Sequence, residues 1–141
     1  MGDLVVTYRG VVYPAQCDHM GHMNVMWYVG KFDEASWQLF HAVGLSAARI
    51  RETGRGMAGL EQHIEYKREL RPGDVISIRS GVLEVREKTL RFAHRMDNDD
   101  TGELAARTTL VAVHLDLVKR RACALPDDVR ERAQSVIVSE V

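Results

Sequence analysis

Residues 17–43 of the chain read CDHMGHMNVMWYVGKFDEASWQLFHAV, a polar loop that runs directly into an amphipathic segment. After Asn24, apolar residues recur at positions 25, 28, 29, 32, 35, 39, 40 and 43, which is the spacing of one face of an α-helix. The pattern stops at Gly44, a residue type that favours helix termination. This stretch therefore predicts one long, half-buried helix of about 18–20 residues that begins next to Asn24.

The loop before this helix carries residues suited to acyl-transfer chemistry. Asp18, Gly21, His22 and Asn24 place a carboxylate, a flexible glycine, an imidazole and a capping amide close to the helix N-terminus. The first turn of a helix has unpaired N–H groups and a dipole that favours negative charge. Acyl transfer needs a base or nucleophile together with such donors, because negative charge develops on the carbonyl oxygen.

The composition is that of one ordinary globular domain. The chain has 141 residues, of which 45% are hydrophobic and 28% charged, and we expect a single domain over residues 1–141. The 19 basic and 20 acidic residues give a net charge of −1, without the broad basic surface that binding to nucleic acid requires. The chain has only two cysteines, no apolar run of membrane-spanning length and no signal segment. We therefore expect a cytoplasmic protein that binds no membrane.

Five segments are predicted to be β-strands, because they are rich in β-branched and aromatic residues or alternate between apolar and polar positions: 4–13, 59–70, 75–86, 88–98 and 103–118. Turn-forming residues at 71–74 and 97–102 separate several of them. Gly81 is predicted to mark a β-bulge. Short helices are expected within 46–56 and over 129–133.

This order of elements favours an α+β fold, in which a five-stranded antiparallel sheet wraps around one long helix. A single helix covers only one face of such a sheet, and the edge strands remain exposed. A small domain most readily covers an exposed edge with a second copy of itself. We therefore expect a homodimer or a homotetramer, with the site where subunits meet.

The motif D-x-x-G-H-x-N at 18–24, followed by the long helix and the strands, resembles the hotdog-fold thioesterases. The resemblance is to the branch of 4-hydroxybenzoyl-CoA thioesterase and related short acyl-CoA thioesterases, and it spans nearly the whole chain. Further matching features follow in order, namely Tyr28, Glu34-Ala35, Arg71-Pro72-Gly73-Asp74, Lys88-Thr89-Leu90 and Leu125-Pro126. The resemblance implies a hotdog fold and an acyl-CoA thioesterase. It implies no cofactor other than the coenzyme A of the substrate.

Roles for the loop residues follow from this chemistry. Asp18 is the predicted nucleophile or general base, because the helix dipole keeps a nearby carboxylate ionised. If Asn24 caps the helix, the Val25 amide is its first free donor, and in the family this position polarises the thioester carbonyl. Many relatives carry a second asparagine where this chain has Val25. Gly21 would allow close approach of the backbone to the acyl group, and His22 either orients Asp18 or the acyl group or packs within the loop.

Substrate-binding residues are expected on the helix and on distant strands. Tyr28 and Phe32 are predicted to line the acyl pocket, whereas Trp37 and Phe40 are predicted to lie in the core. The phosphates of coenzyme A require basic residues at the mouth of the site, and the resemblance implies that some come from a neighbouring subunit. The candidates are Lys88, Arg91, Lys119, Arg120 and Arg121.

Alternatives remain open for both the site and the function. Cys17, His19 and His22 form only a weak zinc-binding pattern, and we expect no metal. Glu34 is an alternative base, and further polar candidates lie on one predicted strand, namely Glu61, His63 and Glu65. The alternative functions are an acyl-thioester hydratase or dehydratase on the same fold and a non-catalytic acyl-CoA-binding module.

Overall fold

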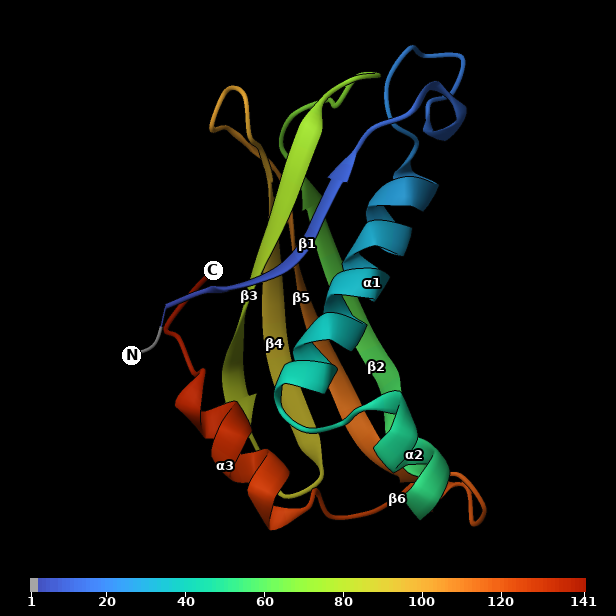
Figure 1. Ribbon diagram of the computed structural model, residues 1–141, viewed down its shortest axis with the longest axis vertical. Helices are drawn as coiled ribbons and strands as arrows, with labels where there is room; N and C mark the ends of the chain where they lie inside the picture. Colours follow the sequence, from blue (N-terminus) through green and yellow to red (C-terminus); the bar gives the residue numbers. More distant parts are fainter. Residues whose placement is uncertain (1–2) are drawn as a thin grey trace.

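The computed structural model describes residues 3–141 and has an α+β architecture (Figure 1). Five long strands form one antiparallel sheet in the order β1-β3-β4-β5-β2, and a short sixth strand pairs with β5. The strands are β1 (Val5–Val11), β2 (Arg55–Tyr66), β3 (Val75–Val85), β4 (Thr89–Asn98), β5 (Leu104–Asp116) and β6 (Arg121–Ala122). The predicted five-stranded antiparallel sheet is confirmed, and β6 is an addition of two residues.

The long helix α1 (Val25–Ala42) lies along one face of this sheet (Figure 1). It begins where the sequence predicts, and Gly44 ends it with a φ of +99°, a conformation that glycine adopts without strain. The shorter helices are the 3-10 turn η1 (Pro14–Gln16), α2 (Ala47–Thr53) and α3 (Asp127–Ser135). In Figure 1, α2 and α3 both lie at the lower end of the sheet.

The apolar stripe of α1 packs on the sheet, with one exception to the prediction. Phe32, Ala35 and Leu39 are buried, and Phe40 is only 5% exposed. Trp37 is 45% exposed, so its predicted place in the core was wrong. Position 37 lies beside the buried stripe, and the indole ring covers the edge of Phe40 at a centroid distance of 5.4 Å.

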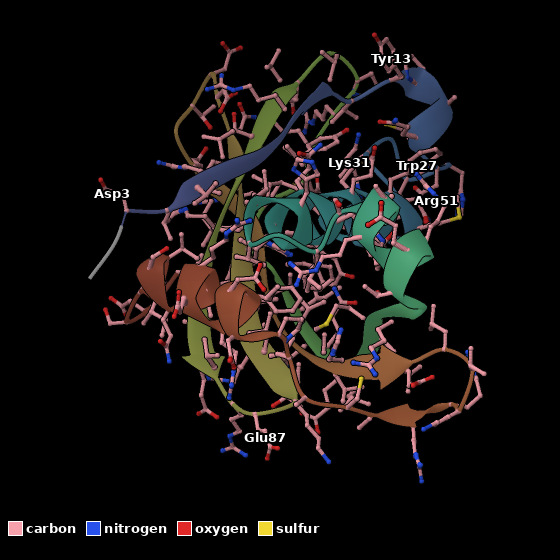
Figure 2. All side chains as sticks on the ribbon, turned by 60° about the horizontal axis from the view of Figure 1, so that its bottom comes forward. Asp3, Tyr13, Trp27, Lys31, Arg51 and Glu87 are labelled. Atoms are coloured by element: carbon pink, nitrogen blue, oxygen red, sulfur yellow. The ribbon has the colours of Figure 1, made fainter. Side chains whose placement is uncertain are left out.

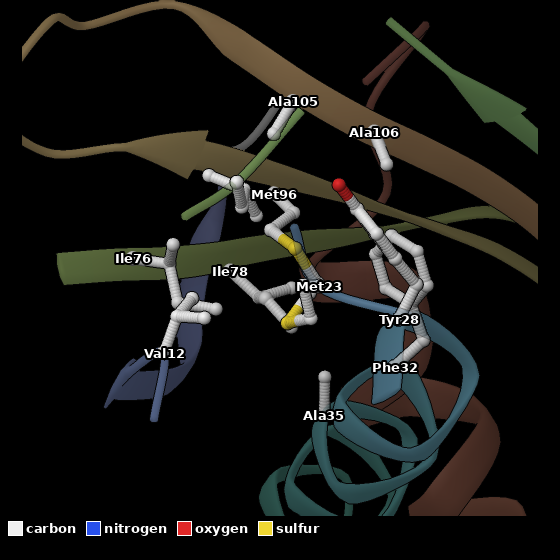
Figure 3. Packing of buried hydrophobic residues seen from close by; sticks show 11 residues of the cluster. Val12, Met23, Tyr28, Phe32, Ala35, Ile76, Ile78, Met96, Ala105 and Ala106 are labelled. Atoms are coloured by element: carbon white, nitrogen blue, oxygen red, sulfur yellow. The ribbon is translucent and has the colours of Figure 1, made fainter. Parts of the chain in front are cut away.

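The buried apolar residues form two clusters along α1. Figure 3 shows the first, in which Met23, Tyr28 and Phe32 pack against Ile78 and Met96 of the sheet. The second lies nearer the C-terminus of α1 and includes residues of α3. This packing removes the apolar face of the helix from water, which is the main stabilising contribution to the fold.

A buried polar network joins α1 to the sheet. His94 on β4 is fully buried, with its Nδ1 atom 2.5 Å from Ser80 Oγ and its Nε2 atom 2.9 Å from Ser36 Oγ. Burial lowers the pKa of His94 to about 3, so the ring is neutral at physiological pH. Phe32 stacks on the imidazole at a centroid distance of 5.9 Å.

The predicted bulge at Gly81 was wrong in its position. The register between β3 and β4 shifts between Val82 and Glu84 instead. Close packing explains the glycine at position 81, because a Cβ atom there would collide with the side chain of Val138. The C-terminal segment bonds to β3 beyond the end of β1, where the Val138 amide donates to the Val82 carbonyl oxygen at 2.9 Å.

Three connections gather at the upper end of the sheet in Figure 1: residues 12–24, 67–74 and 99–103. Backbone hydrogen bonds join the first two, including one of 2.7 Å from the Met23 amide to the Leu70 carbonyl oxygen. Figure 2 shows Tyr13, near this end, far from Glu87 in the β3–β4 turn. Among residues 3–141, no helix combines the length and the apolar character needed to cross a membrane.

Candidate active site at the N-terminus of α1

The loop between η1 and α1 is a compact turn held by its own backbone. The Gly21 amide donates to the Asp18 carbonyl oxygen at 3.0 Å, and the Asp18 amide donates to the His22 carbonyl oxygen at 3.1 Å. Gly21 has a φ of +87°, which an L-residue rarely adopts. A Cβ atom there would meet nothing within 4 Å, so backbone conformation alone explains this glycine in the free protein.

Asn24 links the loop to the helix through both ends of its side-chain amide. Its Nδ2 atom donates to Asp18 Oδ2 at 2.8 Å, and its Oδ1 atom accepts from the Met26 amide at 2.9 Å. The second contact is the predicted N-cap, with the backbone of Asn24 extended at φ −72° and ψ 149°. The Met20 amide donates to the other Asp18 oxygen, also at 2.8 Å.

These hydrogen bonds determine the charge of Asp18. The bond from the Asn24 side chain, then that from the Met20 amide, lower the pKa of this carboxyl below its usual value, and the nearby His22 and His19 act in the same direction. Asp18 is therefore an ionised carboxylate at neutral pH with a fixed orientation. The structure brings Asp18, Gly21, His22, Asn24 and Val25 together, as the sequence predicts.

The first residue of α1 keeps its backbone donor free. Asn24 accepts from Met26 through its side chain and from Trp27 through its carbonyl oxygen, at 2.9 Å each. Within residues 3–141, the Val25 amide has no hydrogen-bond acceptor. This N–H group stands at the positive end of the helix dipole, where it can donate to an oxyanion.

A pocket of about 230 Å³ lies beside this amide. Val25 lines it from α1 and His22 from the loop, and the opposite wall comes from the end of β2 and the following connection. The complete lining is His22, Met23, Val25, Tyr28, Tyr66, Lys67, Arg68 and Glu69. Of the five predicted catalytic residues, only His22 and Val25 line this pocket, and Asp18 lies outside its lining. The opposite wall comes from a segment about 40 residues further along the chain.

Tyr28 forms one wall of this pocket. Its ring is buried and its hydroxyl group donates to the Arg68 carbonyl oxygen at 3.1 Å. Burial raises the pKa of Tyr28 to about 12, so the phenol stays protonated. The prediction for Phe32 is not met within one chain, because its side chain is fully buried against His94 and does not reach the pocket.

His22 does not touch the Asp18 carboxylate through its ring. Its Nδ1 atom lies 3.5 Å from the Met23 carbonyl oxygen, and its Nε2 atom lies 3.6 Å from Glu69 Oε1. Asp18 is oriented by Asn24 and Met20 instead. His22 therefore does not hold the carboxylate, and it lines the pocket.

The basic residues predicted for coenzyme A lie away from this loop within one chain. Lys88 is in the β3–β4 turn and Arg121 is in β6, both at the far end of the sheet from residue 18 (Figure 1). Arg91 lies on β4 in a separate hollow with Glu65 and Arg107. A second subunit is needed to bring any of these three to the site.

Other basic residues, missed by sequence reasoning, do lie next to the pocket. A hollow of about 580 Å³ shares Lys67 and Arg68 with the pocket and adds Arg71. Their signal in the sequence is the run Lys67-Arg68-Glu69-Leu70-Arg71 before the predicted turn at 71–74. The turn was noted, but only the fold shows that this connection lies against the helix N-terminus.

The alternative candidates are separated from this pocket. Glu34 is exposed in the middle of α1 and lines a different hollow with Trp37 and His41. His63 on β2 lies 3.9 Å from Glu65, outside the pocket lining. Within residues 3–141, no three His, Cys, Asp or Glu side chains are grouped closely enough to hold a metal ion.

Known proteins resemble this chain in sequence. The thioesterase-like superfamily matches residues 12–133. A betainyl-CoA thioesterase of Pseudomonas aeruginosa is 24% identical over 136 residues, which are 96% of this chain and 86% of that protein. An L-carnitine dehydrogenase/betainyl-CoA thioesterase of Agrobacterium fabrum is 29% identical over 109 residues, 77% of this chain. The matched part is 22% of that longer protein.

Solved structures resemble it in fold. A hypothetical protein of Staphylococcus aureus in complex with CoA superposes with a TM-score of 0.90 at 20% identity, over 100% of this chain and 89% of that one. A 1,4-dihydroxy-2-naphthoyl-CoA thioesterase of Synechocystis superposes with a TM-score of 0.81 at 18% identity, over 93% and 96%. These likenesses confirm the hotdog fold, and the names of the relatives agree with the predicted class of thioester hydrolase. Because its match extends over residues 12–133, the chain belongs to the thioesterase-like superfamily.

Proposed function

We propose that this protein hydrolyses an acyl-CoA thioester to a carboxylic acid and CoA at the N-terminus of α1. One arrangement carries this proposal: the Asn24 amide caps α1 and also holds the ionised Asp18 carboxylate, while the neighbouring Val25 amide stays free. Membership of the superfamily supports thioester chemistry. The relatives named as betainyl-CoA thioesterases support CoA as the thiol of the substrate.

In the proposed reaction, the thioester carbonyl oxygen accepts a hydrogen bond from the Val25 amide. Asp18 removes a proton from a water molecule as the water oxygen attacks the carbonyl carbon. The Val25 N–H and the helix dipole stabilise the negative charge that develops on the carbonyl oxygen. The C–S bond then breaks, and the CoA thiolate takes up a proton.

Asp18 has a second possible role in the same geometry. As a nucleophile, its carboxylate oxygen attacks the carbonyl carbon, CoA thiolate leaves, and water opens the resulting anhydride. Both routes need an ionised carboxylate with a fixed orientation, which the contacts from Asn24 and Met20 favour. Both routes also use the Val25 amide in the same way.

We propose that the phosphates of CoA bind at the hollow next to the acyl pocket, through the basic residues among its mixed basic and acidic lining. Lys67 and Arg68 line both spaces, so a CoA ester that enters one can extend into the other. Arg71 in this hollow forms no ion pair within residues 3–141, which leaves its guanidinium free to meet a phosphate. Lys88, Arg91 and Arg121 would contribute only from a second subunit.

We further propose that the protein is at least a homodimer, paired through β2. This strand is at the end of the sheet order, and β5 pairs with it on one side only. Its apolar side chains Leu60 and Tyr66 are 59% and 49% exposed. A long exposed edge with apolar side chains readily pairs with another strand, and Tyr66 would bring that contact to the rim of the acyl pocket.

A panel of aliphatic and aromatic acyl-CoA esters, followed by detection of free thiol, tests the proposed reaction. Release of CoA above the uncatalysed rate for at least one ester is the expected result. Loss of the enoyl absorbance from an unsaturated ester, without release of thiol, would identify a hydratase instead. Ester binding with neither change would identify a binding module, and both of these outcomes contradict the proposal.

A further inference from the structure

The β2 edge, where a second chain is proposed to pair, determines the direction of that pairing. β2 runs from Arg55 to Tyr66 at the end of the sheet order. A two-fold axis that joins the same edge of two chains into one sheet makes the two β2 strands antiparallel. Leu60, which is 59% exposed, lies at the middle of β2, so pairing over the whole strand brings it close to the axis. Arg55 then lies opposite Tyr66 of the partner subunit.

Helix α2 lies at the same end of β2 as Arg55. It ends at Thr53, two residues before β2 begins, and Ile50 lies within van der Waals distance of the Cβ position at Gly56. In Figure 1, α2 lies at the lower end of the sheet and the loop of residues 12–24 at the upper end, both on the side of β2. The two-fold axis exchanges these two ends. It therefore brings α2 of one chain next to the catalytic loop and the acyl pocket of the other.

The basic residues beside the pocket cannot balance the charge of CoA within one chain. The Lys67 ammonium lies 3.4 Å from Glu65, and the Arg68 guanidinium lies 3.1 Å from Glu103, so both are already paired. In the described part of the chain, Arg71 is the basic residue of this hollow that forms no ion pair. CoA carries a 3′-phosphate and a pyrophosphate, so one guanidinium leaves most of its negative charge unmatched.

Arg51 of α2 is the basic residue best placed to add to this charge. It is exposed, and no carboxylate within residues 3–141 forms an ion pair with it. Its neighbours Arg49 and Arg55 are held by carboxylates of α3 and β5. Arg91 and Arg121 belong to β4 and β6, which lie beyond β5 from the paired edge. Pairing through β2 therefore brings Arg51 closer to the pocket of the other chain than either of them.

We infer that Arg51 of the partner subunit binds a phosphate group of CoA at the mouth of the acyl pocket. Each complete site then consists of the catalytic loop of one chain and α2 of the other. A guanidinium group suits this task, because its planar set of donors matches the oxygens of a phosphate. This inference rests on the proposed thioesterase function and on pairing through β2.

The first test presents one acyl group on two thiols. The acyl group of the best ester in the panel is attached to CoA and to N-acetylcysteamine, which has the reactive end of CoA without its phosphates. Arg51→Glu should lower kcat/KM for the CoA ester at least tenfold, the scale of a hydrogen bond to a charged group. It should leave kcat/KM for the N-acetylcysteamine thioester unchanged, which also shows that the variant folds and assembles.

Two further variants accompany this comparison. Arg51→Ala, which removes the charge without reversing it, should show the same selective loss at a smaller size. Arg9→Glu makes the same charge reversal at an exposed residue of β1, at the opposite end of the sheet order, and should alter neither value. An unchanged kcat/KM for the CoA ester in Arg51→Glu, or an equal loss for both thioesters, overturns the inference.

The second test asks which chain contributes Arg51. Asp18→Asn and Arg51→Glu chains with different affinity tags are expressed together, and the mixed dimer is purified. If Arg51 acts on the partner's site, one of the two sites has both Asp18 and Arg51 intact, and the mixed dimer should hydrolyse the CoA ester at about half the wild-type rate. If Arg51 acts within its own chain, neither site is intact. A mixed dimer no more active than the Arg51→Glu protein overturns the inference.

The failure of this inference differs from the failure of the proposed function. Hydrolysis of CoA esters that does not depend on Arg51 overturns the inference and leaves the thioesterase function intact. No hydrolysis of any ester in the panel by the wild-type protein overturns the thioesterase function, and the inference with it.

Discussion

Asn24 performs two tasks with one side chain. Its carbonyl oxygen caps α1, and its NH₂ group holds the carboxylate of Asp18. Capping stabilises the helix by satisfying an orphan N–H group, typically by about 1 kcal/mol. The bond to Asp18 stabilises the charged form of the carboxyl and lowers its pKa. A substitution that keeps the first contact and removes the second separates the two tasks.

Asn24→Asp is such a substitution. Aspartate caps a helix as well as asparagine does, but it cannot donate a hydrogen bond to Asp18, and its charge repels the neighbouring carboxylate. We expect the pKa of Asp18 to rise, so the acid limb of the kcat/KM profile moves to higher pH. Titration of activity between pH 3 and 8 measures this shift. A profile identical to that of the wild type would show that Asn24 does not control the charge of Asp18.

At the residue scale, the sequence predicts the loop better than the pocket. Asp18, Gly21 and Asn24 lie close together in the chain, so the motif already predicts that they are neighbours in the fold. Tyr66 and Glu69 could not be predicted, because they reach the pocket only through the curvature of the sheet and the path of the 67–74 connection. Alternation along a strand does not tell which face meets the helix N-terminus.

At the scale of elements, the contact of α1 with β3 and β4 combines apolar packing with one polar network. His94 lies between Ser80 of β3 and Ser36 of α1, and its ring is neutral because burial disfavours the charged form. Its pKa is lowered to about 3 in the folded chain, against an ordinary value of 6.5. Between these two pH values, the unfolded chain therefore binds a proton at His94 that the folded chain does not bind.

This difference makes the fold sensitive to mild acid. Because the pKa is lower in the folded state, His94 costs no stability above about pH 6.5, and stability is lost as pH falls from there toward 3. Between pH 7 and 5 we expect this group to reduce the free energy of unfolding by about 2 kcal/mol. Urea unfolding of the wild type and of His94→Gln measures it, and the variant should lose less stability. An equal loss in both proteins would contradict the account.

The sequence pattern of a helix or strand predicts that the element exists more reliably than it predicts the first and last residues. The period of α1 gives the helix to within a residue, because its apolar stripe is long. β2 begins at Arg55 rather than at 59, since Gly56 and Gly59 weaken the strand pattern. A Cβ atom at Gly56 would lie 3.4 Å from Ile50 of α2, an ordinary van der Waals contact, so packing does not require glycine there.

At the scale of the whole molecule, one chain forms a site that is open on one side. The β2 edge is exposed, and the basic residues predicted for CoA lie at the opposite end of the sheet from Asp18. A second chain paired along β2 would cover the edge and bring new residues to the rim of the pocket. The single long helix in the sequence already predicts that a second chain covers the exposed edge. The sequence does not predict how the two chains are arranged.

We expect light scattering to find at least two chains in each particle. Leu60→Asp places a charge on the exposed β2 edge and should shift the protein toward monomers with reduced hydrolysis. Val118→Asp is the matched control, because Val118 is 84% exposed in the turn before β6 and should leave the assembly unchanged. A fully active monomer would contradict the shared site.

The central claim is that Asp18 at the N-terminus of α1 carries out thioester hydrolysis, and the most direct test is the thiol-release rate of Asp18→Asn. The substitution keeps the size of the side chain and leaves one acceptor oxygen, so one of the bonds from Asn24 and the Met20 amide remains and the fold should persist, as thermal unfolding will verify. We expect kcat to fall by about 10²-fold or more, the usual scale for loss of a base or nucleophile. Asp33→Asn, an exposed carboxylate on the same helix, should retain the wild-type rate. A near wild-type rate in Asp18→Asn would contradict the account and move the chemistry to another residue.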